Sequence, residues 1–278
     1  MTPGEHAESL IAGLGITSPQ ELDIEAIAFS SGVEVAYEPL SGCEATLVGF
    51  GKRAIATIKP SGSRGRERFS IGHELGHWKL HRGRSFRCRA DDPDSNLASD
   101  RPLEQEADTF ASHLLMPGPL FNPATRAFGQ PNFAQLSDVA KEFGTSLMAT
   151  AIRLARINTL PVIVACYGQR GLRWKVAAAD ISRRWWLRSE LDEDSFTFDL
   201  LNSGKECKIL GKQSADAWFT NDDAEDYEVY EQCLPSQNGE ALVLIYLSTA
   251  AMQNRKFDSG VGNRKYNEHG SYVQRSPK

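Results

Sequence analysis

Apolar residues near the N-terminus recur at helical spacing, with short polar breaks between the runs. Residues 2–15 and 18–32 each fit one short helix. Ser18 before Pro19 is typical of a helix N-cap followed by proline at the first helical position. We therefore expect two short helices before residue 33.

The pattern changes to alternation over residues 33–40 and 45–60, which are also rich in β-branched side chains. Both properties favour strands, and Gly49 to Lys52 contains the turn formers of a hairpin. This part of the chain predicts a small sheet that contains a hairpin.

Helical spacing returns at residues 66–81 and again at residues 103–121. The second run is closed by Pro117 and Pro119, because proline interrupts helical hydrogen bonding. The intervening residues 82–102 are polar and rich in turn formers, so we expect an irregular loop between the two helices.

Residues 131–160 have the outline of a helix-turn-helix, with a turn at Gly144 and Thr145 and a possible helix cap at Ser146. The charged side chains of the two helices leave a net charge of only +1 (Lys141, Arg153 and Arg156 against Asp138 and Glu142). Because DNA binding relies on a strongly basic surface, we expect this segment to pack on protein or to dock a substrate, and not to contact DNA.

Residues 161–251 predict a second unit. Residues 161–181 fit two strands around a turn from Gly168 to Gly171, and residues 239–248 fit a buried late strand. Three tryptophans of this region can line a ligand pocket or form core, and we favour core (Trp185, Trp186 and Trp218). Residues 252–278 are polar without periodicity, which predicts a flexible tail.

The composition argues against several classes of protein. A formal net charge of −5 argues against a protein that coats nucleic acid or an anionic membrane. No apolar run reaches the roughly 20 residues of a membrane span, and the N-terminus lacks the features of a signal peptide. The five cysteines are odd in number and scattered, which suits a reducing compartment without a structural disulfide. We therefore expect a cytoplasmic protein.

The first long helix contains the run GHELGH, whose residue types are those of a metal-binding and water-activating site. His73 and His77 are four residues apart, so their side chains project from one face and can reach one ion. Glu74 lies about 100° around the axis, where it can take a proton from water without being a ligand. A zinc ion held by three protein groups keeps one position for water and lowers the pKa of that water to about 7. The motif alone leaves a peptidase and a chance match both open.

A third ligand is expected on the following helix. Glu104 and Glu106 both lie near its start, but about 200° separates them, so only one can face the metal. Asp108 shares a face with Glu104 and can accept the free ring N–H of a ligating histidine. We therefore predict Glu104 as the ligand and place Glu106 and His113 on the solvent side.

The runs RFSIGHELGHWKLH and EQEADTFASHLLMP resemble the motifs of the ImmA/IrrE family of bacterial metallopeptidases, in the same order and at a similar distance. The resemblance implies metal ligands at His73, His77 and Glu104 and a catalytic base at Glu74. It also implies an outer hydrogen-bond partner at Asp108, where the family more often has Asn.

The same resemblance implies an α+β fold. It places a zincin-like metallopeptidase domain with a small sheet at residues 1–130, and the helix-turn-helix-like segment 131–160 packed on it. Residues 161–251 are expected to be a small α/β sensor-like domain, loosely similar to GAF domains, before the flexible tail 252–278. Zinc is the expected cofactor, although two histidines and a carboxylate also accept manganese or iron.

Two further residues near the site are ambiguous. His81 lies about 12 Å along the axis from His73, so we expect it outside the site, favoured by the negative end of the helix. Cys88 lies between Arg87 and Arg89, whose charges favour a thiolate that can act as a redox-sensitive or inhibitory metal ligand. A solvated loop cysteine is the interpretation that we favour.

Two classes of function fit these predictions. The first is a regulatory zinc-dependent endopeptidase that cleaves a specific partner protein, such as a helix-turn-helix transcriptional repressor in a stress or mobile-element response. The second is a metal-dependent regulator that does not cut and acts on DNA or a partner protein through its helix-turn-helix-like segment or C-terminal domain. The presence of Glu74 between the histidines favours the enzyme, since a regulator without catalysis has no need of a base there.

Overall fold

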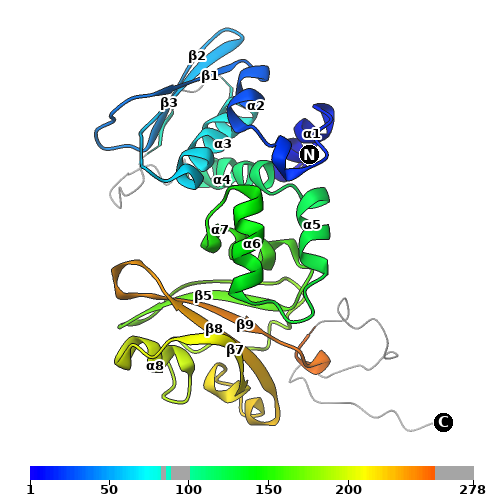
Figure 1. Ribbon diagram of the computed structural model, residues 1–278, viewed down its shortest axis with the longest axis vertical. Helices are drawn as coiled ribbons and strands as arrows, with labels where there is room; N and C mark the ends of the chain where they lie inside the picture. The colour runs from blue at the N-terminus through cyan, green and yellow to red at the C-terminus, as the bar shows by residue number, and fades with distance from the viewer. Residues whose placement is uncertain (83–85, 89–100, 254–278) are drawn as a thin grey trace, which may run out of the picture. The chain divides into compact units, whose positions relative to one another are not determined.

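The structure is a computed structural model that describes residues 1–82, 86–88 and 101–253 (Figure 1). The chain divides into two compact units. Among the described residues, the first comprises those of Met1–Ala127 with Leu136–Thr150, and the second comprises Phe128–Gln135 with Ala151–Gln253. The predicted domain boundaries at residues 130 and 160 remain a prediction. None of the helices in the described ranges is long and apolar enough to cross a membrane.

The N-terminal helices differ in one detail from the predicted pair. Helix α1 (Pro3–Gly13) forms as expected, but Ser18 and Pro19 begin only the short 3-10 turn η1 (Pro19–Glu21). Helix α2 (Ile24–Ser30) begins later, because the carboxylate of Asp23 accepts hydrogen bonds from the first free backbone N–H groups of this helix.

A four-stranded sheet follows, in the order β1-β3-β2-β4, and its strands are β1 (Val33–Tyr37), β2 (Ala45–Phe50), β3 (Arg53–Ile58) and β4 (Phe86–Cys88). Strands β2 and β3 form the predicted hairpin, and β1 pairs with β3 in parallel. Strand β4 pairs with β2 inside the segment that we expected to be wholly irregular, so that prediction was wrong there. Strand β4 is ordered by its backbone pairing with β2, and the periodicity of its side chains does not indicate this pairing.

The long helix α3 (Arg64–Leu80) lies against this sheet and against helix α4 (Arg101–Leu115), as Figure 1 shows. Every residue of α3 from 71 to 78 is buried, because the sheet, α2 and α4 all contact the helix. The helix is therefore a central element of the first unit, although its sequence contains many polar side chains.

Three shorter helices follow α4, namely α5 (Gly118–Arg126), α6 (Phe133–Phe143) and α7 (Leu147–Ile157). The turn between α6 and α7 contains Gly144 at φ 62°, and the side chain of Ser146 accepts a hydrogen bond from the backbone N–H of Ala149, as predicted for a cap. The helix–turn–helix outline is present, but these contacts do not distinguish a DNA-binding module from two packed helices.

The second unit is built on one antiparallel sheet in the order β6-β5-β9-β8-β7. The strands are β5 (Val162–Gly168), β6 (Gly171–Ala177), β7 (Cys207–Ser214), β8 (Glu228–Pro235) and β9 (Ala241–Tyr246). Helix α8 (Phe196–Ser203) contacts β7, β8 and β9, and short 3-10 turns complete the unit (η2 Ala215–Ala217, η3 Ala224–Asp226, η4 Gln237–Gly239 and η5 Ala250–Met252). The predicted β5–β6 hairpin and buried late strand β9 are both present.

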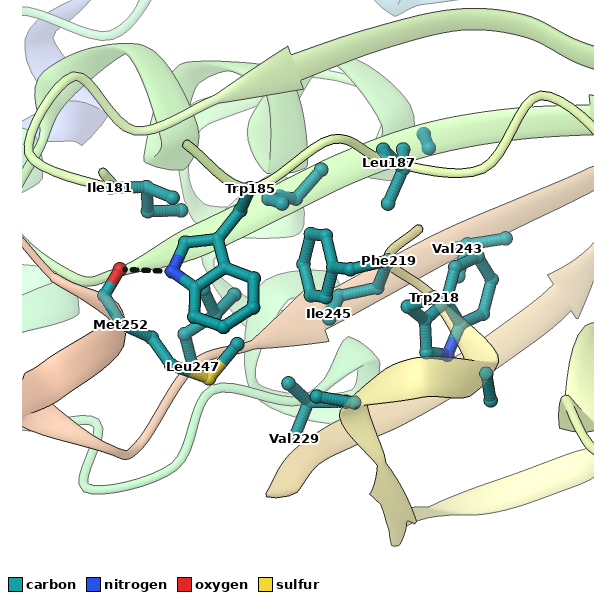
Figure 2. Packing of buried hydrophobic residues seen from close by; sticks show 14 of the residues in the cluster. Ile181, Trp185, Leu187, Trp218, Phe219, Val229, Val243, Ile245, Leu247 and Met252 are labelled. Carbon is teal, nitrogen blue, oxygen red and sulfur yellow. Dashed lines mark hydrogen bonds between the residues drawn. The ribbon is translucent and has the colours of Figure 1, made fainter. Parts of the chain in front are cut away.

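Figure 2 shows how aromatic side chains fill the core of this second unit. The indole N–H of Trp185 donates to the carbonyl oxygen of Met252 at 3.1 Å, and its ring packs against Phe219. Trp218 is buried as well, but Trp186 is 69% exposed. The core prediction therefore holds for Trp185 and Trp218 and was wrong for Trp186, which projects into solvent.

Candidate metal centre

Three side chains from two helices converge in the first unit. His73 and His77 come from α3 and Glu104 comes from the first turn of α4, and one ligand atom of each lies within 4.8 Å of the others. The Nε2 atoms of the two histidines are 3.0 Å apart, and Glu104 contacts both, at 3.0 Å from His73 and 3.4 Å from His77. Two imidazoles and a carboxylate are a donor set that suits zinc, and manganese or iron also accept it.

Small residues allow the two helices to approach closely enough for this convergence. A Cβ atom added at Gly76 would lie 3.1 Å from the Cα of Ala107, and one at Gly72 would lie 3.3 Å from the Cβ of Ala111. Both distances are tighter than ordinary contacts, so larger side chains there would separate α3 from α4. The sequence signal for this approach is a pair of small residues four apart on each helix, Gly72 and Gly76 on α3 and Ala107 and Ala111 on α4.

Burial and the hydrogen bonds between His73 and Glu104 shift the pKa values of both groups. Burial acts to lower the pKa of His73, but its hydrogen bonds to Asp108 and Glu104 outweigh this effect and raise the pKa to about 9. Burial acts to raise the pKa of Glu104, but hydrogen bonds from His73 and His77 lower it to about 2. The carboxylate is thus ready to accept a positive partner, either a proton on His73 or a cation.

Glu74 lies directly after His73 on α3 and is fully buried. Its negative charge contributes to the raised pKa of His73, so the carboxylate is near that ring. Glu74 thus lies next to a histidine of the cluster and outside the cluster itself, as the His-Glu-x-x-His arrangement predicts for a general base.

Asp108 lies beyond the cluster on the second helix, where we predicted an outer partner. Its Oδ1 atom is 2.9 Å from Nδ1 of His73. Because a carboxylate only accepts hydrogen bonds, Nδ1 of His73 donates to Asp108, and Nε2 is directed toward Glu104 and His77.

His81 lies in a different environment from the one predicted. It is 9% exposed at the end of α3, its Nδ1 atom is 3.1 Å from Nδ1 of His77, and its Nε2 atom is 2.9 Å from Oε2 of Glu106. Glu106 is exposed to solvent, as predicted, but it also contacts His81. His113 is half-buried and pairs with Glu8, so its predicted position on the solvent side was wrong in part.

Cys88 lies at the end of β4, opposite Ala45 of β2, and so belongs to a strand and not to an irregular loop. Its side chain and the loop on either side lie outside the described residues. The proposed role of this thiol as a metal ligand therefore stays a prediction.

Residues 23–155 match the family model described as Peptidase_M78, the IrrE N-terminal-like domain. A comparison with curated proteins finds no match. Among solved structures, a Mycobacterium tuberculosis transcriptional regulator is similar, with a TM-score of 0.58 and 14% identity over 93% of this chain and 79% of that chain. At this identity the likeness shows the fold alone.

The matched range contains the whole of α3 and α4, which carry His73, His77, Glu104 and Asp108. Such a family model suggests a metallopeptidase-type regulator, and the cluster of two histidines and a glutamate is consistent with it. The match over residues 23–155 supports the resemblance of this chain to the ImmA/IrrE family.

Proposed function

We propose that the chain is a regulatory zinc-dependent endopeptidase that cleaves a specific partner protein, a helix-turn-helix transcriptional repressor of a stress or mobile-element response. One observation carries the proposal. The ligand atoms of His73, His77 and Glu104 lie within 4.8 Å of one another, and Glu74 is buried on the same helix as the two histidines.

Each residue has a separate role in this proposal. His73, His77 and Glu104 would hold the ion, which is zinc or, with the same donors, manganese or iron. When bound, such an ion supplies Lewis-acid chemistry for peptide hydrolysis. Glu74 takes a proton from the attacking water and delivers it to the leaving amine, and Asp108 keeps the ring of His73 oriented through the 2.9 Å hydrogen bond.

The rest of the chain would regulate access to this site. The antiparallel sheet of the second unit and its helix α8 fit a sensor-like α/β domain, loosely of GAF type. The low net charge of α6 and α7 supports packing or substrate docking by this helix pair over DNA contact. We retain 1–130, 131–160 and 161–251 as the proposed domains. The predicted tail 252–278 does not begin at Met252, which is fully buried, and residues 254–278 lie outside the described residues.

The decisive experiment compares the wild type with Glu74→Gln. Both proteins are purified, their metal content is measured, and each is incubated with helix-turn-helix repressors encoded in the same genome. Wild type should cut one of them, whereas E74Q should keep its metal and cleave at least about 100-fold more slowly, because it lacks the base.

A contaminating protease is excluded if E74Q, purified in parallel, leaves the same substrate intact. The alternative is a metal-dependent regulator that does not cut. It would be supported if both proteins bind metal, neither cleaves any repressor, and the wild type binds DNA tightly with an affinity that falls steeply as salt increases.

A further inference from the structure

A histidine and a carboxylate extend the candidate metal centre away from its ligands. Nδ1 of His77 is 3.1 Å from Nδ1 of His81, and Nε2 of His81 is 2.9 Å from Oε2 of Glu106. We propose that His81 and Glu106 are positioning residues that hold His77 in the tautomer and orientation needed for metal binding. This proposal rests on the proposed metallopeptidase function and adds two residues to its site.

The direction of the hydrogen bonds follows from the chemistry of the groups. The carboxylate of Glu106 only accepts, so Nε2 of His81 carries the proton that it donates. A neutral imidazole has one N–H, which leaves Nδ1 of His81 as an acceptor for the N–H at Nδ1 of His77. The lone pair of His77 then lies on Nε2, the atom that is 3.0 Å from Nε2 of His73 and 3.4 Å from Oε1 of Glu104.

Burial makes the hydrogen bonds of His77 and His81 difficult to replace by water. The side chain of His77 is fully buried and that of His81 is 5% exposed, so water does not readily substitute for a missing partner. Glu106 has a half-exposed side chain and connects this buried pair to the surface. The two ligand histidines therefore have different supports, since His73 contacts a carboxylate directly and His77 contacts one through a second imidazole.

The test measures zinc affinity of the full-length chain by competition with a chromogenic chelator. His81→Leu removes the acceptor for His77 and should weaken zinc binding about 10- to 100-fold. His81→Asn provides an amide oxygen close to the position of Nδ1 and should recover most of the loss. Wild-type affinity in H81L, or an H81N affinity as poor as that of H81L, would overturn the proposal.

Glu106 is tested by a double-mutant cycle. Glu106→Ala should weaken zinc binding less than H81L does, because its side chain is half-exposed. The double variant should bind zinc no more weakly than H81L alone, since both residues act on His77 through one path. Fully additive losses would contradict such a path.

A matched control for His81→Leu comes from helix α4. His113 on α4 pairs with Glu8 at 2.8 Å, a histidine–carboxylate pair about 13 Å along the helix from Glu104. His113→Leu should leave the zinc affinity unchanged, and urea unfolding of each variant separates lost stability from lost positioning. If the wild type binds no zinc, the proposed function fails as well. If it binds zinc and cuts while H81L binds zinc equally well, only the positioning role fails.

Discussion

Nδ1 of His73 lies 2.9 Å from Oδ1 of Asp108, while Nε2 of the same ring is directed toward Glu104 and His77. One imidazole thus connects the candidate metal centre to an outer carboxylate, which accepts a hydrogen bond from Nδ1 and orients the ring.

This relationship predicts the effect of changing Asp108. Asp108→Leu removes the acceptor and should weaken zinc affinity about 10-fold or more, whereas Asp108→Asn keeps an oxygen acceptor and should remain near wild type. The ImmA/IrrE resemblance, in which Asn is common at this position, leads to the same expectation. Equal zinc affinities for wild type and D108L in a chelator competition would contradict it.

The close approach of α3 and α4 predicts that enlarging Gly76 destabilises the protein. Gly76→Ala places a Cβ atom 3.1 Å from the Cα of Ala107, and overpacking of this kind costs about 1–3 kcal/mol of the free energy of unfolding. Zinc affinity should fall too, because Glu104 would move away from the histidines. Urea unfolding and metal titration measure both effects.

Gly13 provides the matched control for that substitution. A Cβ atom added there, in the last residue of α1, meets nothing within 4 Å. Gly13→Ala should therefore leave zinc affinity unchanged and stability within about 0.5 kcal/mol. If G13A and G76A behaved alike, the packing explanation would be wrong.

Replacing the neighbouring tryptophans Trp185 and Trp186 should change the free energy of unfolding by very different amounts. Trp185 is 6% exposed and packs against Phe219 and Tyr227, so Trp185→Ala should cost about 3–5 kcal/mol of the free energy of unfolding. Trp186 is mostly exposed, and Trp186→Ala should change stability by no more than about 0.5 kcal/mol. Similar losses in the two variants, measured by urea denaturation, would refute this placement.

The buried carboxyl of Glu231 should make the free energy of unfolding depend on pH. It is fully buried and accepts hydrogen bonds from Thr197, Trp218 and Phe196, but burial outweighs them and raises its pKa above 4.5. The folded carboxyl therefore holds its proton more tightly than the unfolded one. Its contribution to stability is full below the unfolded pKa and declines as the pH rises through the folded pKa.

The measurement is the free energy of unfolding of wild type and Glu231→Gln in urea, from about pH 4 to about pH 8. The stability of wild type relative to E231Q should fall as the pH rises, because the glutamine does not titrate. A relative stability that rises with pH would show that the hydrogen bonds outweigh burial at this carboxylate.

The sequence by itself determined what lies within single elements. His73 and His77 had to share a face because they are four apart in a helix, and alternation predicted the β2–β3 hairpin. Pro117 correctly marked the end of α4, and Asp108 was identified as a neighbour of a histidine by its helical spacing from Glu104.

Only the tertiary structure decided how different elements meet. The distance between α3 and α4 depends on Gly72 and Gly76 facing Ala107 and Ala111, and periodicity within one helix does not specify a crossing. The same packing buries His81 against His77 and brings Glu106 to it, although both had been placed outside the site. Helical spacing fixes angles around one axis, but contacts between helices follow from shape and close packing across the whole unit.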